Sequence, residues 1–136
     1  LDHGKAWQKT MVVTGQEMLE RIQARFDMEQ VPPANPSETA KRWKHKDGHG
    51  EVGIIASVSE PFCKQCNRLR LTADGHLRTC LFSHNEHDFK SLLKEESTDD
   101  TIIEKLKTVV WGKELGHKIG REDFIQPKRT MSFIGG

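Results

Sequence analysis

The sequence predicts a small α+β domain, in which an antiparallel sheet is flanked by helices. Apolar residues recur at helical spacing near residues 14–26 and 98–110, and short runs rich in β-branched residues lie between these segments. The dipeptide Asp74-Gly75 adds the signal of a tight β-hairpin. The length of 136 residues predicts one domain over residues 1–136.

The first helix is expected after a connecting segment, residues 1–10. Thr14 is a favourable N-cap, and Glu17 completes the spacing of a capping box. The apolar face of this helix follows at helical spacing: Met18, Leu19, Ile22 and Phe26. Three prolines then lie at positions 32, 33 and 36, and proline restricts the backbone and lacks an N–H donor. We therefore expect the helix to end before Pro32 and residues 27–38 to form a loop.

The strands are expected in two pairs. Residues 40–46 and 51–58 flank a Gly-rich turn. Residues 68–72 and 76–80 flank Asp74-Gly75, which fits a two-residue type I′ turn. In that register Ala73 lies opposite His76, and Cys80 lies opposite Leu69. A short helix is predicted around residues 89–93, and a longer one is predicted to begin near Ser97 or Thr98.

Composition narrows the possible partners. The net charge of +1 gives no bulk attraction for nucleic acid, and no apolar stretch approaches the roughly 20 residues that span a bilayer, so we expect neither a nucleic-acid nor a membrane partner. A C-x-x-C motif without a secretory signal is typical of metal or redox chemistry in the cytoplasm. Because the chain begins at Leu1, we expect it to be a fragment of a longer protein.

Three cysteines form the candidate metal site. Cys63 and Cys66 make the C-x-x-C, and the hairpin is expected to bring Cys80 towards them. A zinc-binding interaction module would need a fourth ligand, for which His84 or His87 is available. A [4Fe-4S] cluster on three thiolates would instead keep one iron open for an outside ligand. Unligated core thiols are the third possibility.

Arg68 and Arg70 are the candidate anion-binding residues. They are two positions apart on a predicted strand, so their side chains leave the same face. Guanidinium groups make bidentate, charge-assisted contacts with phosphate. Solvated strand arginines would show the same spacing, but the nearby cysteines favour a functional interpretation.

Residues 61–82, PFCKQCNRLRLTADGHLRTCLF, closely resemble the carboxyl-terminal cluster motif of the GTP 3′,8-cyclases. These are the radical S-adenosylmethionine lyases that begin molybdenum cofactor biosynthesis. Residues 53–59, GIIASVS, and the final Gly135-Gly136 match the same family. The resemblance spans the whole chain.

The resemblance implies that Cys63, Cys66 and Cys80 ligate a second [4Fe-4S] cluster and that Arg68 and Arg70 bind GTP. It also implies that Gly135-Gly136 form a tail reaching the active site. The fold would close an incomplete α/β (TIM-like) barrel supplied by an absent N-terminal domain. That domain would bind S-adenosylmethionine and its own [4Fe-4S] cluster through a C-x-x-x-C-x-x-C that this chain lacks.

The complete enzyme of such a family would convert GTP to (8S)-3′,8-cyclo-7,8-dihydroguanosine 5′-triphosphate by joining ribose C3′ to guanine C8. A homodimer is compatible with the resemblance. We expect the chain by itself to be inactive, because it has three cysteines and none for the cluster that cleaves S-adenosylmethionine.

Overall fold

Two three-stranded antiparallel sheets and three α-helices make up the described part of the computed structural model, which covers residues 8–95, 97–130 and 133–134. The architecture is α+β, with two small sheets where the sequence suggested one. The chain divides into two compact units, Asp2–Cys66 and Asn67–Gly136. The assignment of residues 1–136 to one domain stays a prediction.

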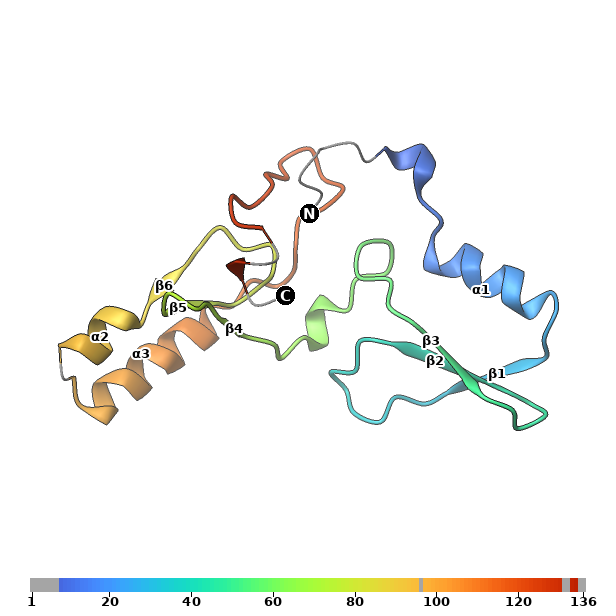
Figure 1. Cartoon of the computed structure of the whole chain (residues 1–136), viewed down its shortest axis with the longest axis horizontal. Coiled ribbons are helices and arrows are strands. Elements are labelled where there is room, and N and C mark those ends of the chain that lie inside the picture. The colour runs from blue at the N-terminus through green and yellow to red at the C-terminus, as the bar shows by residue number, and fades with distance from the viewer. Residues whose placement is uncertain (1–7, 96, 131–132, 135–136) are drawn as a thin grey trace. The chain divides into compact units, whose positions relative to one another are not determined.

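Within residues 8–66, the part of the first unit that the structure describes, there are one α-helix, one sheet and two 3-10 turns. Figure 1 shows their arrangement along the chain. Its strands lie in the order β1-β2-β3. The elements in chain order are η1 Lys9–Met11, α1 Gly15–Gln23, β1 Met28–Val31, β2 Lys41–His45, β3 Glu51–Ile54 and η2 Cys63–Gln65. The predicted start of α1 is confirmed, because the Thr14 hydroxyl accepts a hydrogen bond from the Glu17 backbone N–H at 3.1 Å.

The prediction of a loop over residues 27–38 is wrong, because strand β1 lies inside it. Met28 pairs with His45 and Val31 with Arg42, so β1 takes its hydrogen bonds from β2. This short segment has no apolar alternation, and only pairing with a strand further along the chain makes it extended. Strand β1 ends directly before Pro32, which has no N–H to continue the ladder.

The strand predicted over residues 51–58 is shorter than expected, since β3 ends at Ile54. The backbone then turns, and the N–H of Glu60 donates to the carbonyl of Ala56 at 2.8 Å. β-branched residues continue past this point, but a turn that satisfies its own backbone groups competes with the ladder. The predicted Gly-rich turn between β2 and β3 is confirmed, with Gly48 and Gly50 at positive φ.

The second unit packs two helices against a small sheet (Figure 1). Strands β4 Arg70–Leu71, β5 His76–Arg78 and β6 His87–Asp88 form the sheet, and helices α2 Lys90–Lys94 and α3 Asp99–Trp111 follow. The core consists of apolar residues from β5, α3 and the start of α2: Leu77, Phe89 and Val109, with Leu92 and Ile102 against them. Both predicted helices are confirmed, and Thr98 caps α3 by accepting from the Thr101 N–H.

The hairpin is confirmed, but its predicted register is wrong by one residue. Arg70 pairs with Arg78 and Leu71 with Leu77, and the Thr72 N–H donates to the His76 carbonyl at 2.9 Å. The loop therefore has three residues and places Gly75 at φ 85°, in the left-handed position that follows a type I turn in such hairpins. The Thr72 hydroxyl stabilises this arrangement, because it accepts a hydrogen bond from the His76 N–H at 2.9 Å.

No helix among the described residues is both long and apolar enough to cross a membrane.

Candidate functional site

Cys63 and Cys66 lie at the two ends of a tight turn in the first unit. The 3-10 turn η2 spans Cys63–Gln65, and the Cys66 N–H donates to the Cys63 carbonyl at 3.1 Å. Positions three apart eclipse each other in a 3-10 turn, so C-x-x-C spacing places both residues on one side of it. Both cysteines are half-buried.

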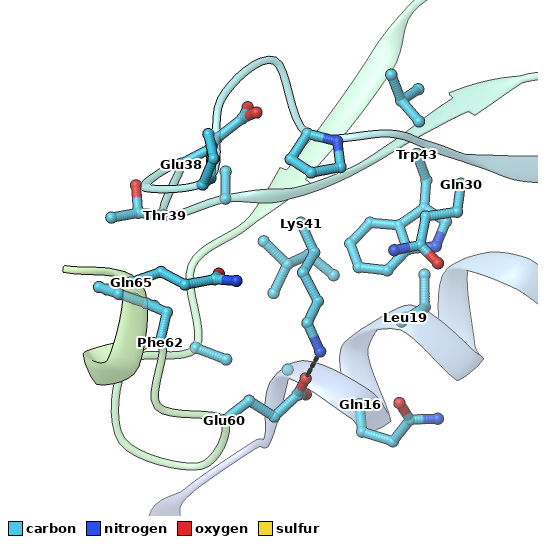
Figure 2. Close-up of a pocket in the computed structure, with 17 residues that line it drawn as sticks. Gln16, Leu19, Gln30, Glu38, Thr39, Lys41, Trp43, Glu60, Phe62 and Gln65 are labelled. Carbon is cyan, nitrogen blue, oxygen red and sulfur yellow. Dashed lines mark hydrogen bonds and ion pairs between the residues drawn. The ribbon is translucent and has the colours of Figure 1, made fainter. Parts of the chain in front are cut away.

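A cavity of about 260 Å³ in the same unit is lined by residues of this turn and of the elements around it. Figure 2 shows Phe62 and Gln65, from the cysteine turn, on one wall of the cavity, and Leu19 of α1 on another. The Lys41 ammonium of β2 forms an ion pair with the Glu60 carboxylate across it. Strand β2 and helix α1 therefore support the segment that leads into Cys63.

Helix α1 approaches that segment closely at its first residue. A Cβ atom on Gly15 would lie 2.8 Å from the Cβ of Ala56 and 3.1 Å from Cγ2 of Ile54, distances too short for a side chain. The absence of a side chain at Gly15 lets the start of the helix pack closely on the side chains of Ile54 and Ala56, which precede the cysteine turn.

Cys80 belongs to the second unit and follows strand β5. It is half-buried, and its carbonyl accepts from the Ser83 N–H at 3.1 Å, so the chain turns directly after it. Thr79 is only 2% exposed, and Ser83 is 5% exposed. The cysteine is thus flanked by two buried polar side chains.

Glu114 satisfies those buried hydroxyls, and its neighbour Lys113 contacts carbonyl oxygens of the same region. Both residues come directly after α3 and its C-cap, Gly112. Glu114 accepts hydrogen bonds from the hydroxyls of Thr79 and Ser83. Burial raises the pKa of the Glu114 carboxyl, but the two hydroxyl bonds, a backbone hydrogen bond and the Lys113 charge together leave the pKa below its ordinary value. Lys113 donates to the carbonyl oxygens of Arg68, at 3.0 Å, and Thr79.

Arg68 and Arg70 are both half-buried in the second unit. The corrected register places Arg70 opposite Arg78, which is 2% exposed. Arg78 pairs with the Glu86 carboxylate and donates to the Ser83 carbonyl. Arg78 is therefore a structural residue, and Arg68 and Arg70 stay the candidates for anion binding.

Arg129 extends this charged network to the hairpin turn. Its guanidinium makes a bidentate contact with Asp74, at 2.8 and 3.1 Å, and a second contact with Glu86 at 2.8 Å. The Arg129 guanidinium and, after it, the Thr72 hydroxyl hold the pKa of the Asp74 carboxyl well below its usual range. Sequence analysis missed Glu86, Lys113, Glu114 and Arg129, because their partners lie 8 to 55 residues away.

His84 and His87, the histidines considered as zinc ligands, have their own hydrogen-bond and strand partners in the fold. The His84 Nε2 lies 2.8 Å from the Ile125 carbonyl oxygen, and His87 pairs with Leu77 in the β5–β6 ladder. Across residues 8–95, 97–130 and 133–134, no three His, Cys, Asp or Glu side chains are grouped as ligands for a metal ion. Gly135 and Gly136, the predicted tail, lie outside the described residues.

The structure is that of an α+β protein with a turn that contains two cysteines, Cys63 and Cys66. A hairpin follows this turn, and in and beside it lie two half-buried arginines and the third cysteine, Cys80. The family model described as Molybdenum Cofactor Synthesis C matches residues 1–119. The chain belongs to this family.

Three relatives match this chain along its entire length. A protein named GTP 3',8-cyclase 2 from Mycobacterium tuberculosis is 40% identical over 140 residues, and the match covers 100% of this chain and 39% of the relative. Proteins named GTP 3',8-cyclase from Mycolicibacterium smegmatis and Streptomyces coelicolor are 41% and 39% identical, with 39% and 40% of their lengths matched. The chain corresponds to the carboxyl-terminal part of these relatives, and the predicted resemblance is confirmed.

Proposed function

We propose that this chain is the carboxyl-terminal, substrate-binding part of a GTP 3′,8-cyclase. In that enzyme GTP would be converted to (8S)-3′,8-cyclo-7,8-dihydroguanosine 5′-triphosphate in molybdenum cofactor biosynthesis. The observation that carries the proposal is the identity of 39 to 41% with relatives of that name along the entire chain. Because the chain spans about two fifths of those relatives, their activity, substrate and partners come to it as proposals.

Cys63, Cys66 and Cys80 would hold a [4Fe-4S] cluster. Cysteine thiolates are the usual ligands of such clusters, and each of these cysteines is half-buried beside a backbone turn. The donors therefore fit the group in their chemistry. When bound, the cluster would offer one iron that has no protein thiolate, where the guanine of GTP can attach.

Arg68 and Arg70 would bind the triphosphate of GTP. Their partial burial reduces solvent screening, and guanidinium groups make charge-assisted bonds with phosphate oxygens. The two arginines would fix the nucleotide by its phosphates and leave the base and ribose free to be oriented for reaction. Gly135-Gly136 would extend towards the same site, where two residues without side chains can approach a substrate closely.

The other partners belong to the rest of the proposed enzyme. An amino-terminal radical S-adenosylmethionine domain would supply its own [4Fe-4S] cluster, and this chain would close the open side of its α/β barrel. The enzyme would act in the cytoplasm, where thiolates stay reduced, and a homodimer is one arrangement of the complete protein.

Anaerobic reconstitution of the chain with iron and sulfide tests the cluster. We expect about one [4Fe-4S] cluster per chain, seen as a brown chromophore and by iron and sulfide analysis. Replacement of Cys63, Cys66 or Cys80 by serine should abolish uptake. His84→Ala and His87→Ala serve as matched controls and should keep it. One zinc without a chromophore, or loss of metal in either histidine variant, would favour a zinc-binding module.

A further inference from the structure

Two consecutive charged residues connect the end of helix α3 to the hairpin. Lys113 and Glu114 come directly after Gly112, the C-cap of α3. Both are half-buried, and both contact the segment that contains Cys80. Helix α3 is itself fixed by Val109, which is 4% exposed in the core. The Lys113–Glu114 pair therefore projects from a rigid element.

Lys113 joins the two chain segments at the open end of the hairpin. The paired part of β4 and β5 ends at Arg70 and Arg78. Beyond that pair, the Lys113 ammonium donates to the carbonyl oxygens of Arg68 and Thr79, one on each segment. An ammonium group with several donors can bridge two carbonyl oxygens where the regular ladder has stopped. Lys113 thus fixes the separation of the two segments just before Cys80.

Glu114 holds the turn on the other side of Cys80. One carboxylate oxygen accepts from the Thr79 hydroxyl at 2.5 Å, and the other accepts from the Ser83 hydroxyl. Thr79 directly precedes Cys80, and Ser83 closes the turn by donating its N–H to the Cys80 carbonyl. Both hydroxyls are almost fully buried, where a hydrogen bond to a charged partner is strong and its loss is costly.

We propose that Lys113 and Glu114 are positioning residues for Cys80, and that they fix the backbone on both sides of this cysteine so that its thiolate is presented to a metal. The inference rests on the proposed cluster function. It adds two residues to that site which touch neither metal nor nucleotide and act through the backbone and hydroxyls around one ligand. A ligand fixed before the metal arrives loses little conformational freedom on binding, so removing the pair should weaken metal uptake.

A charge-neutral double variant, Lys113→Met with Glu114→Ala, tests the proposal. It removes one positive and one negative charge and every side-chain hydrogen bond of the pair. After anaerobic reconstitution we expect iron and sulfide content to fall to less than half of the parent value. In the metal-free chain, iodoacetamide should modify Cys80 at least about tenfold faster, the factor expected for losing one charge-assisted hydrogen bond, with the rate at Cys63 unchanged.

Two control variants separate positioning from general effects. Lys118→Met with Asp123→Ala removes an exposed ion pair of 2.7 Å, with the same change in charge, and should keep parental iron content and alkylation rates. Leu92→Ala destabilises the same unit through its core, from helix α2 and not from α3, without touching the cysteine segment. At a matched loss of thermal stability it should keep more iron than the double variant.

The outcomes that overturn the proposal are specific. Parental iron content and a parental Cys80 alkylation rate in the Lys113→Met/Glu114→Ala variant would overturn it. Equal loss of iron in Leu92→Ala would also overturn it, because the effect would then follow stability alone. A parent chain that takes up no iron would overturn the proposed function instead, and the alkylation rates would still decide whether the Lys113–Glu114 pair fixes Cys80.

Discussion

Gly75 occupies a position in the hairpin turn that leaves no room for a side chain. Its φ is 85°, and its carbonyl accepts hydrogen bonds from the N–H groups of Phe89 and Lys90 at 3.0 and 3.1 Å. A Cβ atom here would lie 2.7 Å from Lys90 Cβ and 3.3 Å from Lys90 Cα. The turn therefore sets the hairpin conformation and also packs against the start of α2.

Gly48 provides a matched control for this position. It has a φ of 83°, but apart from its chain neighbours no residue comes within 4 Å of a Cβ built on it. We expect Gly48→Ala to cost roughly 1 to 2 kcal/mol of unfolding free energy from the left-handed backbone alone. Gly75→Ala should cost about 2 to 5 kcal/mol, because crowding against Lys90 adds to that strain. Chemical denaturation followed by circular dichroism measures both, and equal costs would show that the contact with Lys90 is unimportant.

Arg68 and Arg70 carry the prediction that bears most directly on substrate binding. In the complete two-domain enzyme, Arg68→Ala with Arg70→Ala should lower GTP turnover at least about a hundredfold, because two bonds to charged groups at about 1.5 kcal/mol each sum to roughly 3 kcal/mol. Cluster content should stay at the parental level. Lysine at both positions should restore part of the turnover, since it keeps the charge but loses the planar fork.

A control for the loss of positive charge is Arg121→Ala. Arg121 is an exposed arginine of the same unit, paired with Asp123 at 3.2 Å, and its removal should leave turnover unchanged. If the Arg68/Arg70 double variant binds and converts GTP like its parent at normal cluster content, Arg68 and Arg70 do not form the nucleotide site.

At the scale of elements, the Asp74–Arg129 ion pair connects the hairpin turn to the segment after α3. Because the folded-state pKa of Asp74 lies below its ordinary value, the ionised carboxylate stabilises the fold at neutral pH. This contribution is fully present above the unfolded pKa of about 4, and it is lost as the pH falls further towards the folded pKa. Acid should therefore weaken the contact between these two elements.

Urea denaturation at pH 7 and pH 3 tests this dependence. The Asp74→Asn variant should be less stable than the parent at pH 7, and the difference should shrink at pH 3, where the parental carboxylate loses its advantage. His76 lies 3.5 Å from Asp74, so His76→Gln in both backgrounds separates its charge from that of Arg129. Glu122→Gln, an exposed carboxylate of the same unit, is the control. A constant difference between Asp74→Asn and parent at both pH values would contradict the prediction.

Local signals explain why several elements could be predicted. Thr14 and Thr98 cap their helices through hydrogen bonds to residues three positions later, so the signal and its structural result lie within one turn. The hairpin was also visible, because Asp74-Gly75 supports a tight turn in either register. The register itself could not be predicted, since the sequence allows Gly75 to be either the second residue of a two-residue loop or the third residue of a three-residue loop.

At the scale of the whole molecule, the chain has one set of three cysteines. If these hold the substrate-binding cluster, none is available for the cluster that cleaves S-adenosylmethionine. We therefore expect the chain by itself, reconstituted and reduced, to form no 5′-deoxyadenosine, which chromatography would measure. The complete enzyme should form it under the same conditions and serves as the positive control. If the 136-residue chain alone formed 5′-deoxyadenosine, the proposed division of roles between the amino-terminal and carboxyl-terminal parts of the complete enzyme would be contradicted.

The sequence by itself determined the family, the α+β class, the helix starts and the candidate ligands Cys63, Cys66 and Cys80, because these depend on residue identity and short spacing. Tertiary structure alone decided that residues 28–31 form a strand, that Arg78 is buried with Glu86, and that Lys113 and Glu114 hold the segment around Cys80. The physical reason is that a buried polar group must find a hydrogen-bond partner, and here that partner is supplied by a distant part of the chain.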